Sequence, residues 1–127
     1  MSRPIDFSDV VARVAEFGQL ATLVSVTSEG APHLGTVLVT AGANQLDVRV
    51  GSRTSEHVRV NPSVTLTWLR ADRDYQLIID GVAVASDEPG PDGLFAVSID
   101  PRHGILHRLA GQTDGPTCRS LNASLDS

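Results

Sequence analysis

The chain has 127 residues, of which 41% are hydrophobic, and its formal net charge is −5. This length fits one domain with a hydrophobic core, so we expect a single domain over residues 1–127. The acidic balance and the scattered arginines disfavour nucleic acid as a partner, because nucleic-acid-binding proteins usually present a basic face. No run of about 18 apolar residues is present, and the first residues lack the apolar core of a signal peptide, so we expect no membrane partner.

Cys118 is the only cysteine in the chain. It therefore has no intramolecular disulfide partner, and we expect a cytoplasmic protein in a reducing environment. The region from 112 to 127 is polar, which is typical of a flexible tail.

The first expected element is an amphipathic helix over about residues 7–17. Phe7, Val10 and Val14 recur at helical spacing, Asp6 or Ser8 can cap the first turn, and Gly18 ends the helix. We expect this apolar stripe to pack on the core and assign it no chemistry.

Strand patterns follow. Residues rich in Val, Leu and Thr, or alternating between apolar and polar, occupy 19–27, 33–41, 45–50, 63–70 and 75–85, with 94–99 as a further candidate. The short turns between these ranges favour antiparallel pairing. Five or six such strands with little helix predict a small closed or split barrel.

Ser52, Arg53, Thr54 and Ser55 stand at the start of a short helix between two of these strands. Free backbone N–H groups and the positive dipole end attract phosphate at such a start, and an arginine fork suits phosphate oxygens. The helix is expected to end near Asn61, because a residue before proline is pushed toward extended geometry. A simple capping role for the hydroxyls remains an alternative.

The histidines offer a second possible site. His103 and His107 are four residues apart, a spacing that places two metal ligands on one face of a helix. Gly104 and the absence of an acidic third ligand argue against a metal, and we predict none. His33 begins a strand and His57 lies in the short helix, where either contacts a cofactor or solvent.

The order of strand, Ser-Arg, short helix, Asn-Pro and Thr-rich strand ending in Trp68 resembles the pyridoxamine 5′-phosphate oxidase-like family of split β-barrels. The spacing from Ser52-Arg53 to Asn61-Pro62 fits the family pattern without a gap. The turn at 28–32 fits as well, so the resemblance covers about residues 20–85. One departure is that Thr54 stands where the family commonly has a lysine, and the chain contains no lysine.

The resemblance implies a mainly β protein, a small antiparallel split β-barrel with an N-terminal helix and one short helix between strands. It also implies flavin mononucleotide (FMN), or alternatively the deazaflavin coenzyme F420, bound at the interface of a homodimer that oxidises or reduces a small-molecule substrate. The implied cofactor-binding residues are Gly51, Ser52, Arg53, Thr54 and Ser55 for the phosphate, Thr36 and Val37 along the ring system, and Trp68, which either walls the pocket or is a core aromatic. No catalytic residue is identified.

A second interpretation competes with the redox one. The missing lysine and the unmatched C-terminal region also fit a non-catalytic ligand-binding or scaffold homodimer that keeps the fold.

Overall fold

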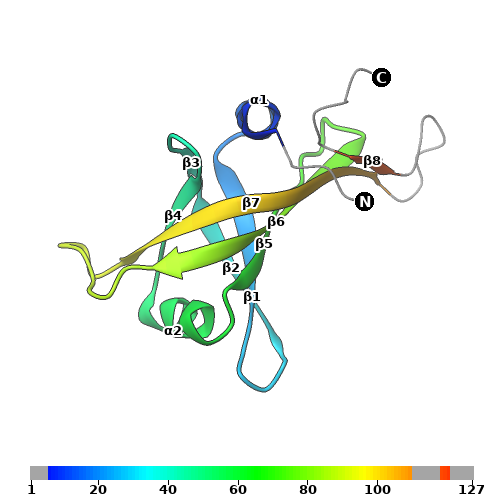
Figure 1. Cartoon of the computed structure of the whole chain (residues 1–127). Coiled ribbons are helices and arrows are strands. Elements are labelled where there is room, and N and C mark those ends of the chain that lie inside the picture. The colour runs from blue at the N-terminus through cyan, green and yellow to red at the C-terminus, as the bar shows by residue number, and fades with distance from the viewer. Residues whose placement is uncertain (1–5, 110–117, 121–127) are drawn as a thin grey trace.

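The computed structural model describes residues 6–109 and 118–120, and their strands form one antiparallel sheet (Figure 1). In chain order the elements are α1 (Phe7–Phe17), β1 (Leu20–Val26), β2 (Pro32–Leu38), β3 (Thr40–Ala41), β4 (Leu46–Val50), α2 (Ser52–Val60), β5 (Ser63–Trp68), β6 (Tyr75–Ala85), β7 (Phe95–Arg108) and β8 (Cys118–Ser120). Most of the tail expected at 112–127 lies outside the described residues.

The sheet curls into a barrel that is not fully closed. Its strands follow the order β2-β1-β5-β6-β7-β4-β3, with β8 paired to β7. β2 and β3 lie at opposite ends of this order, yet only Val39 separates them in the chain. The sheet must therefore bend until its two ends meet. Among the described strands β2 pairs with β1 alone, so the gap between β2 and β4 stays open.

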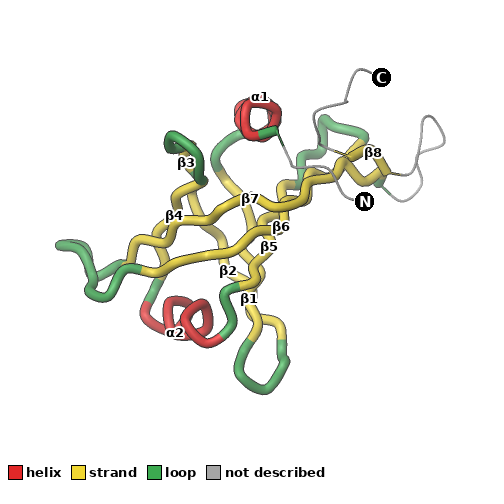
Figure 2. The backbone as a smooth tube through the Cα atoms, in the orientation of Figure 1, coloured by secondary structure: helices red, strands yellow, loops and turns green. Residues whose placement is uncertain are grey.

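The two helices lie at opposite ends of the curled sheet (Figure 2). Asp6 caps α1, since its carboxylate accepts the Ser8 N–H at 3.0 Å, and Gly18 ends the helix with a φ of 95°. This positive φ suits glycine. α1 buries Val10 and Val14, as its helical spacing predicted. α2 ends at Val60, with Asn61 as its C-cap directly before Pro62, so the helix stops near Asn61 as predicted.

The core fills the inside of the curl. On β1 the residues at 21, 23 and 25 are buried, and the alternation predicted for the other strands is seen as well. Trp68 is 1% exposed, and its Nε1 donates a hydrogen bond to the Gly18 carbonyl at 2.9 Å. It therefore joins the end of β5 to the end of α1 as a core aromatic.

β7 is longer than the sequence pattern predicted. We expected a strand at 94–99, whereas β7 continues to Arg108 and pairs with β6 from Val97 to Arg108. The side-chain alternation is interrupted by a bulge, where the register shifts between Asp80 and Gly81. On β7 the buried positions change from odd numbers to even numbers across this bulge. Because the alternation of buried and exposed residues is interrupted in the middle of β7, the sequence pattern predicts separate short segments and not one long strand.

The outer face of β1 and β2 is largely apolar. Leu20 lies opposite Leu38 and Val24 lies opposite Leu34, and the three leucines are 62% to 64% exposed. We call these four residues the outer apolar face. None of the helices in the described part is long and apolar enough to span a membrane.

Candidate functional site

A cavity of about 280 Å³ lies in the open gap of the barrel, between β2 and β4. We call it the split pocket. It is lined by Leu23, Gly35, Thr36, Val37, Arg49, Val50, Gly51, Thr54 and Leu94. Backbone groups of two strand edges border this pocket. Within residues 6–109 and 118–120, β2 is paired with β1 alone, and residues 48–50 of β4 are paired with β7 alone.

The N-terminus of α2 forms one end of the split pocket. Gly51 is the N-cap and supplies no side-chain hydrogen bond to the helix. The first backbone bond runs from the Ser55 N–H to the Gly51 carbonyl at 3.1 Å. The N–H groups of the preceding turn therefore have no helical acceptor, which is the usual arrangement for anion binding at a helix start.

Arg53 adds a positive charge beside this helix start. Its side chain is exposed and makes no hydrogen bond or ion pair within the described part of the chain. An arginine with no internal partner is available to an anionic ligand, whereas a paired one must first be separated from its carboxylate.

The serines of this segment have different surroundings. Ser55 is 1% exposed and its hydroxyl donates to the Ser52 carbonyl at 2.7 Å, so this hydroxyl stabilises the helix. Ser52 is exposed at the first position of α2. Thr36, Val37, Gly51 and Thr54 are brought together in the pocket lining, whereas Ser52, Arg53, Ser55 and the buried Trp68 are absent from it.

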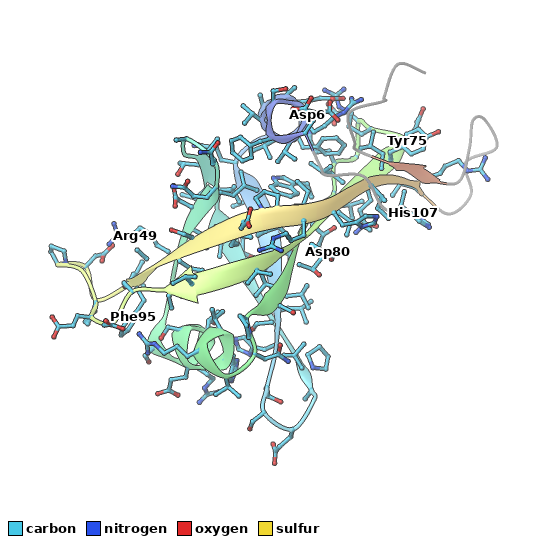
Figure 3. The ribbon with its side chains drawn as sticks, viewed as in Figure 1. Asp6, Arg49, Tyr75, Asp80, Phe95 and His107 are labelled. Carbon is cyan, nitrogen blue, oxygen red and sulfur yellow. The ribbon has the colours of Figure 1, made fainter. Side chains whose placement is uncertain are left out.

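Arg49 lines the opposite wall but is already paired. It donates to the carboxylate of Asp92, which also accepts the Leu94 N–H at 3.1 Å. The Leu94 hydrogen bond, followed by that of Arg49, lowers the pKa of Asp92 below its usual value. This pair fastens the loop before β7 to β4, at the same end of the molecule as Phe95 (Figure 3).

Two histidines that do not line the split pocket lie next to each other, and one of them contacts Thr54. The Thr54 hydroxyl lies 3.2 Å from Nε2 of His33. The His33 ring packs edge-to-face against the His57 ring, with centroids 4.8 Å apart and planes at 77°. Two atoms of this region are buried without a hydrogen-bond partner in the described chain, Nδ1 of His57 and the hydroxyl of Ser25, and Ser25 lies opposite His33 in the strand register.

His103 and His107 are placed on strand β7 and not on a helix, so the helical spacing considered for them does not apply. His103 Nδ1 lies 3.6 Å from the Asp80 carboxylate, and His107 lies near the end of β7 opposite Gln76 of β6 (Figure 3). Within residues 6–109 and 118–120, no group of three or more His, Cys, Asp or Glu side chains is placed to hold a metal.

The sequence did not single out several residues of the pocket lining. Leu23, Gly35, Arg49, Val50 and Leu94 come from four separate segments, and they meet only because the sheet curls. Gly35, a glycine within a strand, was the one available signal, since such a glycine often marks a close approach of a ligand or of backbone.

Searches of known proteins give partial matches to the sequence. No protein-family model matches the chain. Two uncharacterised proteins, from Mycobacterium bovis and Mycobacterium tuberculosis, are each 38% identical to it over 69 residues, which is 54% of this chain and 48% of theirs. The match thus spans about half the length of these curated relatives.

Solved structures resemble the fold over most of the chain. A protein related to general stress protein 26, of the pyridoxinephosphate oxidase family, from Clostridium acetobutylicum has a TM-score of 0.68 at 12% identity, covering 94% of this chain and 97% of that one. An F420 reductase has a TM-score of 0.55 at 14% identity, covering 80% and 90%. The heme storage protein HutZ from Vibrio cholerae has a TM-score of 0.58 at 13% identity, covering 72% and 89%. The chain therefore has the split β-barrel fold of the pyridoxamine 5′-phosphate oxidase-like family, as its sequence resemblance implied.

Proposed function

We propose that the protein binds FMN, or alternatively coenzyme F420, in the split pocket and acts as an oxidoreductase on a small-molecule substrate. The observation that carries this proposal is the α2 N-terminus, where Gly51 and Thr54 line a cavity with both apolar and polar walls. Arg53, which has no partner in the described part of the chain, stands in the same first helical turn. A phosphate at one end and a flat apolar ring along the rest is the ligand that such a site suits.

The phosphate would bind at the first turn of α2. The N–H groups after Gly51 have no helical acceptor, and Thr54 lines the pocket beside them. Arg53 would supply the positive charge that the family commonly shares between arginine and lysine. Ser55 has a smaller part in this proposal than in the sequence interpretation, because its hydroxyl is engaged by the Ser52 carbonyl.

The ring system would lie along β2 and β4. Leu23, Val37 and Val50 offer apolar contacts, and the borders of the pocket carry backbone donors and acceptors that are not used in strand pairing. A flavin or deazaflavin ring has both an apolar face and an amide-like edge, so it can use both kinds of group. When bound, such a cofactor supplies hydride transfer, and the chain supplies binding and orientation.

We further propose that the protein is a homodimer joined through the outer apolar face. Leu20, Leu34 and Leu38 are each more than 60% exposed and lie close together on paired strands. Clustered exposed leucines on a small domain favour association with a partner surface. Sedimentation velocity at micromolar concentration tests this, because a monomer under those conditions would contradict it.

The non-catalytic alternative is favoured by the chemistry of the pocket lining. Among the described residues that line it, Arg49 alone is ionisable, and it is paired with Asp92, so the lining shows no group that would act directly on a substrate. A ligand-binding or scaffold homodimer would need none. A solved structure of similar fold belongs to a heme storage protein, which supports a binding role as the alternative.

The experiment that separates these functions is a parallel titration of the purified protein with FMN, coenzyme F420 and heme. Flavin or deazaflavin fluorescence and the visible spectrum report binding. Saturable micromolar binding of FMN or F420 supports the redox proposal and identifies the cofactor. Binding of heme alone, or of none of the three, would refute it and leave the non-catalytic account.

A further inference from the structure

One carboxylate oxygen connects two residues of the split pocket that come from different segments. Oδ1 of Asp92 accepts a hydrogen bond from the Arg49 guanidinium and another from the Leu94 N–H, the second at 3.1 Å. Arg49 belongs to β4, whereas Leu94 lies just before β7, and both line the pocket. Asp92 itself is absent from the lining. This carboxylate therefore fixes the position of two lining residues without bordering the cavity.

The loop that carries Asp92 is held by its own backbone. The Gly90 N–H donates to the Leu94 carbonyl at 2.8 Å, and the Gly93 N–H donates to the Gly90 carbonyl at 2.9 Å. Gly93 has a φ of 80°, a value that suits glycine. The loop thus has a defined shape, and Asp92 has a defined place in it.

Gly90 leaves room for the Arg49 guanidinium beside this loop. A Cβ built on Gly90 would lie 2.9 Å from Nη2 of Arg49, which is closer than an ordinary contact. The guanidinium therefore packs directly on the loop backbone while Asp92 accepts its hydrogen bond. An arginine side chain has many rotamers in the absence of such contacts. Here one rotamer is selected in the folded protein itself.

We propose that Asp92 is a positioning residue that keeps Arg49 and Leu94 where a flat ring in the split pocket contacts them. Side chains that are ordered before binding do not have to be ordered by the ligand, which raises the affinity. The inference rests on the ring position in the proposed function and makes no use of the phosphate. Because the ion pair of Asp92 with Arg49 is half exposed, dissolved salt screens it and loosens this wall of the pocket.

A second arginine fastens the hairpin of β6 and β7 at a different place. Arg59 of α2 donates to the Ser86 carbonyl, and its guanidinium lies over the Phe95 ring, 5.4 Å from the centroid. Arg59, Ser86 and Phe95 are all absent from the pocket lining. Arg59→Met therefore removes a comparable contact of the same hairpin but not one of the pocket wall, and it is the matched control.

Riboflavin is the probe, because it has the ring but no phosphate and no net charge. Fluorescence titrations at low and at high sodium chloride concentration give its affinity. Asp92→Ala should weaken riboflavin binding about two- to tenfold, since the ligand must then order a long side chain. Asp92→Asn keeps an oxygen acceptor and should restore part of the affinity. High salt should weaken binding to the unmodified protein at least about twofold, whereas neither Asp92 variant should respond to salt.

Arg49→Met tests whether Asp92 acts through Arg49. The substitution removes the guanidinium and keeps an apolar stem, so it should weaken riboflavin binding about as much as Asp92→Ala does. Combining the two substitutions should weaken binding little more than either alone, because both remove the same contact. Arg59→Met should keep both the affinity and its salt response. Thermal melts of every variant show that it is folded.

Unchanged riboflavin affinity in folded Asp92→Ala would overturn the inference, as would additive losses in the double variant or an equal loss in Arg59→Met. A salt response that persists in Asp92→Asn would overturn it as well. Failure of both FMN and riboflavin to bind the unmodified protein would refute the proposed function together with this inference. Equal affinities for FMN and riboflavin, with the Asp92 effects as expected, would support this inference while refuting the phosphate site.

Discussion

Replacing Gly35 by valine should weaken the binding of FMN without lowering the stability of the folded protein. Gly35 lines the split pocket, and a Cβ built on it meets no atom within 4 Å. There is therefore room for the first carbon of a side chain at this position, and the two further carbons of valine extend toward the cavity. Glycine within a strand destabilises by about 0.5–1 kcal/mol relative to alanine, and valine favours strands, so the thermal midpoint should stay level or rise.

The valine side chain should also weaken the binding of FMN, because it occupies part of the cavity. Three added carbons in a cavity of about 280 Å³ take space from a flat ring that lies along β2. Overpacking typically costs about 1–3 kcal/mol, so FMN should bind about 5- to 150-fold more weakly. Flavin fluorescence titration gives the affinity and a thermal melt gives the stability. Thr40→Val, on an exposed strand position outside the pocket, is the control. Unchanged FMN affinity in folded Gly35→Val would refute the location of the ring.

Three further predictions concern charge, packing and pH. Arg53→Ala should weaken the binding of FMN by about 1.5–3 kcal/mol, roughly ten- to a hundredfold, because a charge-assisted contact to the phosphate is lost. The binding of riboflavin, which has no phosphate, should change little. An equal loss of affinity for both ligands would show that Arg53 is not part of a phosphate site. Gly81→Ala should lower the free energy of unfolding in urea by about 1–3 kcal/mol, because the new Cβ would lie 2.6 Å from the Asp100 carbonyl oxygen. An unchanged free energy of unfolding would contradict the close approach of the strands at the bulge. Hydrogen bonds from the Ser8 hydroxyl and N–H lower the pKa of Asp6 below 3.8. The ionised Asp6 carboxylate therefore contributes fully to folding stability above pH 3.8, and this contribution is lost as the pH falls through the lowered pKa. Asp6→Asn should make thermal stability between pH 5 and pH 2 less dependent on pH, and an unchanged profile would argue against this cap.

The elements with an unbroken periodicity could be predicted from the sequence. The helical spacing of the apolar residues Val10 and Val14 predicted α1, and the proline after Asn61 predicted where α2 ends. Most of the strands also follow from their alternation. β7 did not, because the bulge opposite Gly81 shifts its buried positions from odd to even numbers. The sequence pattern records such a shift only as an interruption.

The candidate site was predicted in part. The residues at the start of α2 share one short segment, so their proximity to one another follows from the chain itself. Gly35, Arg49 and Leu94 belong to different segments and meet only when the sheet curls, which local patterns do not encode. The contact of Thr54 with His33 likewise depends on where α2 packs against β2. Trp68 had two interpretations, and the structure places it in the core.

The most direct test of the central claim compares FMN with riboflavin in the same equilibrium titration. The two ligands share the ring and differ by the phosphate, so their difference isolates the contribution of the α2 N-terminus and Arg53. The account predicts saturable micromolar binding of FMN and binding of riboflavin at least about tenfold weaker, a difference of about 1.4 kcal/mol. Equal affinities for the two ligands would contradict the phosphate site.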